Sequence, residues 1–173
     1  PTNSQRESIY NVISTGSHDD FIPSNEVIIA GAKDKYRKNL NALKLIKELN
    51  SITPPKHLQD KTIYATKEEQ EILNGFSGWG ALPQVFDPKN ENWSKEYNEL
   101  KQLLTEQEFA EARNSTQNSF YTPKIIIDTI YKSLDRLGLN NDDHKKEILE
   151  PSVGTGLFLG FNKQRTIYEL ETN

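Results

Sequence analysis

The chain has 173 residues, in which 21 Lys and Arg stand against 25 Asp and Glu, so its formal net charge is −4. Hydrophobic residues make up 34%, a low share for a globular chain, but enough for one core or two small ones. The lack of Cys excludes disulfides, thiolate zinc sites and a cysteine nucleophile, and the scattered histidines form no metal-ligand pair. The net acidity argues against a nucleic-acid binder whose whole surface is basic.

No run of residues approaches the roughly 18 apolar positions of a membrane-spanning helix, and the first residues lack the basic and apolar segments of a signal peptide. We therefore expect no membrane partner and a cytoplasmic location, with which the lack of Cys agrees. The sequence starts at Pro1 and contains no Met, so we expect it to be a piece of a longer protein.

Residues 1–30 are rich in polar clusters, which predicts an extended polar lead-in. A helical region is expected over 31–117. Its first helix is predicted over 33–49, because apolar residues recur there every three or four positions. Residues 51–64 contain two adjacent prolines and are predicted to form a linker.

Two capping boxes predict helix starts at Thr66 and Thr105, because each Thr is followed three residues later by Glu. The first helix is expected to run to about Asn74. Another helix is predicted over 94–104. Residues 75–83 hold too many Gly and Pro for a helix.

The last third changes character. Thr122 is predicted to cap a helix that begins at Pro123, since Pro at the first helical position loses no hydrogen bond. This helix is expected to stop at Gly138, and it carries an apolar stripe made of Ile126, Ile127, Ile130, Tyr131, Leu134 and Leu137. A short strand over 147–149 then runs into a glycine turn and an apolar run, the pattern that begins a nucleotide-type α/β unit.

Gly154 and Gly156 form the candidate ligand-binding turn. A Gly-x-Gly sequence lets the backbone turn tightly and leaves no side chain between it and a ligand. Glu150, at the strand end, suits a partner that is cationic or rich in hydroxyls. An ordinary turn is the alternative. The spacing to Gly160 departs from that of dinucleotide binders and no phosphate-loop sequence is present, so ATP hydrolysis is not expected.

Three segments resemble motifs of class I DNA methyltransferases. Leu149 to Leu159 (LEPSVGTGLFL) resembles motif I, which binds S-adenosylmethionine, and Asn118 to Pro123 (NSFYTP) resembles motif X, which closes over the methionine part of this cofactor. Thr166 to Glu171 (TIYELE) resembles motif II, whose acid binds the ribose. Motif X ahead of motif I is the order of the adenine-N6 class. The resemblance implies an α/β fold class, with a mostly helical N-terminal region followed by the truncated start of a Rossmann-like methyltransferase domain over 118–173.

The resemblance also implies roles for individual residues. Glu150 would lie near the amino group of the cofactor, and 152–156 would wrap the cofactor with backbone. Thr122 would contact the methionine carboxylate end, and Glu169 would bind the ribose. The cofactor site implied in this way comprises Tyr121, Thr122, Pro123, Glu150, Pro151, Ser152, Gly154, Gly156 and Glu169.

The spacing before Glu169 is short. Thirteen residues from Gly156 are few for a helix, a loop and a strand. Either Glu171 takes the ribose-binding role, or residues are missing between Gly160 and Thr166.

Two further stretches, Gly31 to Asn39 and Phe76 to Asp87, resemble the helical region of very large methyltransferase–helicase proteins of phages and conjugative elements. The resemblance implies that the parent protein methylates N6 of adenine in DNA after flipping the base, with a helicase-type ATPase in the same chain. The Asn/Asp-Pro-Pro-aromatic loop that holds the base is not in this sequence, so no catalytic residue is assigned and the fragment alone is expected to be inactive. Thr53 to Lys56 lacks the aromatic residue and is predicted to be linker.

Other functions remain open. A non-catalytic DNA-binding or scaffolding module of an antirestriction or helicase assembly is the second hypothesis, and methylation of RNA or protein is the third. The first helix has a local charge of +4 between Gly31 and Asn50, which suits a solvated face or contact with a DNA backbone. Trp79 is predicted to be a packing anchor rather than a base-stacking residue.

Overall fold

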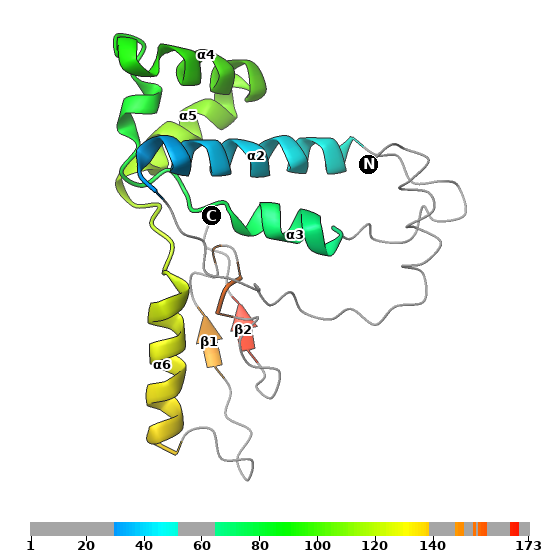
Figure 1. Cartoon of the computed structure of the whole chain (residues 1–173), viewed down its shortest axis with the longest axis vertical. Helices are drawn as coiled ribbons and strands as arrows, with labels where there is room; N and C mark the ends of the chain where they lie inside the picture. Colours follow the sequence, from blue (N-terminus) through cyan, green and yellow to red (C-terminus); the bar gives the residue numbers. More distant parts are fainter. Residues whose placement is uncertain are drawn as a thin grey trace, which may run out of the picture.

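The fold is known from a computed structural model, which describes residues 30–51, 65–138, 148–150, 154, 156–158 and 167–169. These residues are mainly helical (Figure 1). The predicted polar lead-in and the predicted linker lie outside the described residues, apart from Ala30 and Ser51, and so do residues 139–147. In chain order the elements are α2 (Ala32–Asn50), α3 (Lys67–Asn74), α4 (Ser94–Leu103), α5 (Glu106–Asn114), α6 (Lys124–Arg136), β1 (Ile148–Glu150) and β2 (Ile167–Glu169), with short 3-10 helices at Pro83–Phe86, Glu91–Trp93 and Ser115–Gln117.

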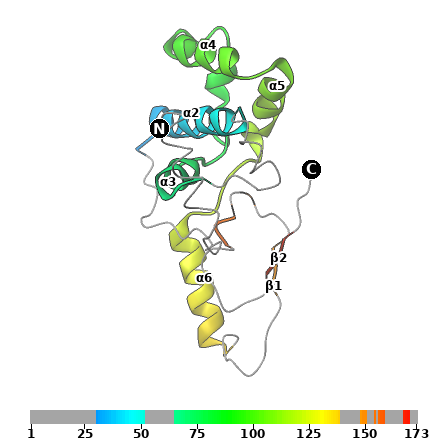
Figure 2. The same cartoon turned by 90° about the vertical axis from the view of Figure 1, so that its right-hand side faces the viewer.

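Residues 32–51 and 65–117 form a helical unit around α2. This helix lies between α3 on one side and α4 and α5 on the other (Figure 1 and Figure 2). Its apolar stripe packs against residues of the 79–100 segment, because an amphipathic helix gains stability by burying that stripe. The buried core consists of Tyr36, Leu40, Trp79, Leu82, Val85, Phe86, Trp93 and Leu100.

Trp79 is at the centre of this core, with only 4% of its surface exposed. Its ring lies 6.4 Å from that of Tyr36, 6.2 Å from that of Phe76 and 5.4 Å from that of Phe86, and the last two contacts are edge-on. Such arrangements are the preferred ones for aromatic pairs. The prediction that Trp79 is a packing anchor is therefore confirmed.

Both predicted capping boxes are present. The Thr66 and Thr105 hydroxyls each accept a hydrogen bond from the backbone N–H of the Glu three residues later, at 3.2 Å, and each Glu carboxylate accepts from the Thr backbone in return. The predicted cap at Thr122 is wrong. α6 begins at Lys124, its N-cap is Pro123, and no side chain caps it. The carbonyl of Pro123 accepts from the N–H groups of both Ile126 and Ile127, so Thr122 lies outside the helix.

The expected α/β fold class is also wrong, because no Rossmann-like α/β domain is visible in the described residues. Their only strands, β1 and β2, are three residues long and pair in parallel. In Figure 2, α6 stands apart from this pair instead of covering it. Within the apolar stripe of α6, Ile127 is fully buried, but Ile126, Ile130 and Leu137 are 48%, 41% and 74% exposed, so half of the stripe lacks the sheet that would cover it in that fold.

Thr105 and Thr122, each of which precedes a helix, give a matched test of these assignments. Thr105→Ala is expected to lower the free energy of unfolding by about 0.5–2 kcal/mol, because it removes a capping hydroxyl. Thr122→Ala is expected to change it by less than about 0.5 kcal/mol, because Thr122 caps nothing. Urea denaturation followed by circular dichroism measures both, and equal losses would contradict the assignment of Pro123 as the N-cap.

Candidate cofactor site

The segment with the motif X resemblance, residues 118–123, lies on a tight turn at residues 77–81. The N–H of Gly80 donates to the carbonyl of Ser119 at 2.9 Å, and the N–H of Ala81 donates to that of Thr116 at 3.2 Å. The ring of Tyr121 lies 5.9 Å from that of Phe76. Backbone hydrogen bonds and an aromatic contact therefore hold the 118–123 segment, which leads into α6, against the helical unit.

Glycine is required at two positions of the turn, because the 118–123 segment approaches so closely. A Cβ added at Gly80 would lie 2.5 Å from the carbonyl oxygen of Ser119, and one at Gly78 would lie 2.6 Å from the same atom. Gly78 also has a φ of 74°, in the left-handed region that favours glycine. Gly78 and Gly80 thus make room for the 118–123 segment. These two glycines belong to the stretch with the methyltransferase–helicase resemblance, and the segment is the one with the motif X resemblance.

Two side chains of α2 hold this turn from the other side. Asn39, which is fully buried, donates from Nδ2 to the carbonyl of Gly78 at 2.7 Å and accepts at Oδ1 from the N–H of Ser77 at 2.9 Å. Lys35 Nζ donates to the carbonyl of Gly80 at 2.8 Å. Asn39 and Lys35 satisfy backbone groups that the turn leaves without partners, which is how a buried irregular segment is stabilised.

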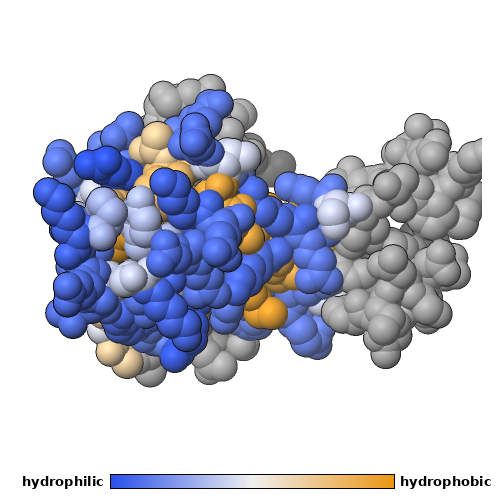
Figure 3. Space-filling view, turned by 90° about the horizontal axis from the view of Figure 1, so that it is seen from above, coloured by the Kyte–Doolittle hydropathy of each residue, from blue (hydrophilic) through white to orange (hydrophobic). Residues whose placement is uncertain are grey.

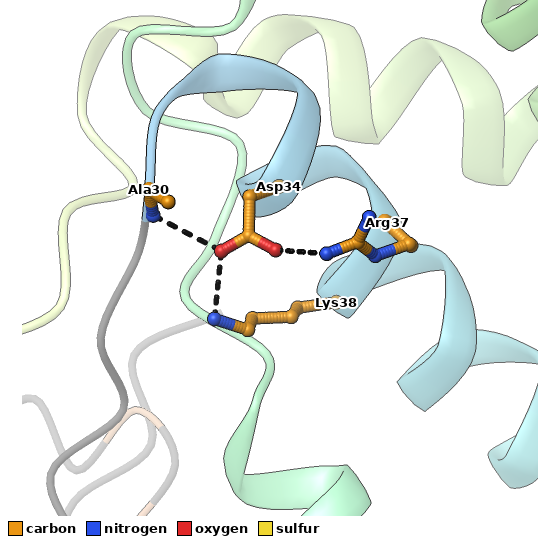
Figure 4. Close-up of polar contacts among 4 residues, drawn as sticks. All are labelled: Ala30, Asp34, Arg37 and Lys38. Atoms are coloured by element: carbon orange, nitrogen blue, oxygen red, sulfur yellow. Dashed lines mark hydrogen bonds and ion pairs between the residues drawn. The ribbon is translucent and has the colours of Figure 1, made fainter.

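The other cations of α2 are paired with acids. Lys33 pairs with Glu96 of α4 and its ammonium lies 3.9 Å from the centroid of the Trp93 ring. Asp34 accepts from Arg37 and Lys38 of its own helix and from the backbone of Ala30 (Figure 4). Across to the neighbouring helices, Lys44 pairs with Glu99 and Lys47 pairs with Glu108.

These ion pairs offset most of the positive charge on α2. The Lys38 ammonium, more than any other group, holds the pKa of Asp34 below its usual value, and the backbone N–H of Thr105, followed by Lys47, does the same for Glu108. Most of the basic charge on α2 is therefore neutralised within the helical unit, which weakens the interpretation of α2 as a DNA-tracking helix. The face of the unit seen in Figure 3 is largely hydrophilic, with hydrophobic residues only in small patches.

The glycine turn is connected to α6. Tyr131 of α6 donates its hydroxyl to the carbonyl of Phe158 at 2.6 Å, and the two rings lie 6.4 Å apart. Gly154 and Gly156 have φ values of 56° and 77°, so both use the freedom that only glycine has without strain. Pro151 and Ser152, also in the predicted cofactor site, lie outside the described residues.

The two acids of the predicted site are register partners. β1 and β2 run parallel, and Glu150 is paired with Glu169 at the carboxyl ends of the strands. The structure thus brings together, at the backbone level, the acids implied by the motif I and motif II resemblances.

Sequence reasoning missed three residues that organise this region. Asn39 is a polar residue among the apolar positions of α2, and this break in the stripe was the available signal. The sequence predicts Tyr131 only as part of an apolar stripe. It predicts Lys35 only as one of the six basic residues between Gly31 and Asn50. Their partners at Gly78, Gly80 and Phe158 are far along the chain, so spacing alone does not reveal them.

Other features of the described residues assign no further chemistry. A polar hollow of about 410 Å³ lies between the 83–88 and 113–117 segments and includes none of the predicted site residues. Within the described ranges, no group of three or more His, Asp or Glu is placed to hold a metal ion. None of the helices described there is both long enough and apolar enough to cross a membrane.

Comparisons with protein-family models, with curated proteins and with solved structures each gave no match.

Asn39 and Asn41, two residues apart on α2, give a matched pair for testing the turn. Asn39→Ala is expected to lower the free energy of unfolding by about 1–3 kcal/mol, because it leaves the partly buried N–H of Ser77 and the buried carbonyl of Gly78 unsatisfied. Asn41 is exposed, so Asn41→Ala is expected to change it by less than about 0.5 kcal/mol. Urea denaturation of the two variants measures the difference, and equal effects would contradict the role of Asn39.

The lowered pKa of Glu108, held down first by the Thr105 N–H and then by Lys47, predicts acid sensitivity. Because the folded pKa of Glu108 is lowered, its contribution to stability is complete above its ordinary value of 4.5 and is lost as the pH falls through the lower folded value. Urea midpoints measured between about pH 6 and pH 3 should therefore fall with pH. Glu108→Gln keeps an oxygen for the Thr105 cap but does not titrate, so its midpoint should fall less; an identical pH profile would contradict this assignment.

Proposed function

We propose that this chain supplies part of the S-adenosylmethionine site of a DNA methyltransferase that acts on N6 of adenine, within a larger methyltransferase–helicase protein. The observation that supports this most is the hydrogen bond of 2.6 Å between the Tyr131 hydroxyl and the Phe158 carbonyl. It joins α6, which begins directly after the motif X segment, to the residues that follow the glycine turn. A cofactor site built from both segments needs such a connection.

The residues that are described fit a ligand of this kind. Gly154 is exposed and has a left-handed φ, so its backbone is open to a ligand with no side chain in between. The backbones of Glu150 and Glu169 are register partners at the ends of two parallel strands. The motif I and motif II resemblances imply that these two acids bind the amino group and the ribose hydroxyls of the cofactor. Thr122 is half-buried and makes no helix cap, which leaves its hydroxyl for a ligand contact.

The bound cofactor would supply an activated methyl group, and the residues of this chain would bind and orient it. The 77–81 turn holds the 118–123 segment by backbone bonds and glycine contacts, and this fixes where Tyr121 and Thr122 lie. Such positioning accounts for much of the rate gain when two substrates must meet in line. In such a protein the base-holding loop would lie outside residues 1–173, and we expect DNA contact there, since most cations of α2 are already paired.

Calorimetric titration of the full-length protein with S-adenosylhomocysteine tests the proposal. Wild type should bind. Gly154→Val should abolish binding, because a β-branched residue is strained at a φ of 56° and its methyl groups occupy the space next to the turn. Thr122→Ala should weaken binding while leaving stability unchanged, and Thr122→Ser should retain it.

Thr105→Ala is the matched control, since it removes a genuine helix cap far from the site in sequence and should lower stability without altering affinity. A wild-type protein that binds no S-adenosylhomocysteine would contradict the proposal and favour the scaffolding alternative. Binding that is unchanged in both Gly154→Val and Thr122→Ala would contradict the assignment of these residues to the site.

A further inference from the structure

Lys35 lies where the helical unit meets the motif X segment. Its ammonium donates to the carbonyl of Gly80 at 2.8 Å, and the N–H of that same Gly80 donates to the carbonyl of Ser119. The ammonium is also 5.9 Å from the centre of the Phe120 ring, which is 62% exposed. Lys35 is therefore a cation beside Gly80 and Phe120, and Phe120 directly precedes residues 121–123.

Lys35 differs in charge pairing from every other cation of α2. Each of the other five forms an ion pair with a carboxylate, whereas the bond recorded for Lys35 is to a neutral carbonyl. An ammonium has three donors, and one of them is used here. Burial lowers the pKa of Lys35, which means that its charge is partly removed from water without a carboxylate among the described residues to compensate.

Two other cations lie close to the motif X segment in sequence. Lys124, at the start of α6, pairs with Asp128 at 2.7 Å, four residues along the same helix. Arg113, five residues before the segment, has no acidic partner in the described part of the chain, but it is exposed. Lys35 is therefore the partly buried cation of this region whose charge has no acidic partner among the described residues. A ligand carboxylate would neutralise the charge of Lys35. S-adenosylmethionine carries a carboxylate at its methionine end, which the motif X segment is expected to bind.

Resting on the proposed function, we propose that Lys35 binds the carboxylate of the cofactor. The helical unit would then have two roles at the site: it holds the 118–123 segment through the 77–81 turn, and it provides the cation for the anionic end of the ligand. Charge-assisted bonds of this kind are among the stronger hydrogen bonds in proteins.

The test compares two ligands that differ in the group concerned. S-adenosylhomocysteine carries the carboxylate, and 5′-methylthioadenosine lacks the amino-acid part. In the full-length protein, Lys35→Met should weaken binding of S-adenosylhomocysteine by about tenfold to a hundredfold, the loss expected for a hydrogen bond to a charged group. It should leave binding of 5′-methylthioadenosine within about twofold, and Lys35→Arg should retain both affinities.

Two further variants separate ligand binding from structure. Lys35→Gln keeps an N–H donor for the Gly80 carbonyl but has no charge, so it should fold and still lose affinity for S-adenosylhomocysteine selectively. Lys44→Met removes a cation of α2 that pairs with Glu99, and it should change neither affinity.

The outcomes are distinguishable. Selective loss for the ligand with the carboxylate supports the proposal. Equal loss for both ligands, or no loss, overturns it and reduces Lys35 to a support of the turn, while the proposed function stands. A wild-type protein that binds neither ligand overturns both the proposed function and this inference.

Discussion

The contact between the helical unit and the segment that leads into α6 depends on one buried side-chain amide, that of Asn39. Asn39 satisfies the N–H of Ser77 and the carbonyl of Gly78, and this stabilises the turn at its buried residues 78–80. On one side of the turn Trp79 enters the aromatic core, and on the other Gly80 binds the backbone of Ser119. A single side chain thus couples the packing of the helical unit to the placement of the segment that leads into α6.

Local features of the structure were predictable from the sequence and long-range ones were not. The capping boxes at Thr66 and Thr105 follow from residues three apart, and the helix around Tyr36 and Leu40 follows from apolar periodicity. The start of α6 was misplaced by one residue, because Pro123 takes an extended conformation and its carbonyl, rather than the hydroxyl of Thr122, meets the first free N–H groups.

The candidate site shows the same division. The glycines at 154 and 156 were identified from a short motif, and their left-handed φ values agree with the turn that the motif predicts. The α/β class was inferred from that motif as well, but a sheet needs strands that pair over long distances, and the described strands are three residues long. Likewise, the charge count on α2 could not reveal that Lys44 and Lys47 are paired with acids more than fifty residues away.

The aromatic core has an optical consequence. The chain has two tryptophans, Trp79 and Trp93, and both are buried within the helical unit, where their rings contact Tyr36. Intrinsic tryptophan emission therefore reports the melting of this unit alone and carries no direct signal from β1, β2 or the glycine turn. A fluorophore introduced after β1 and the native indoles would be independent probes, so that the order in which the two parts of the chain lose structure becomes measurable within one sample.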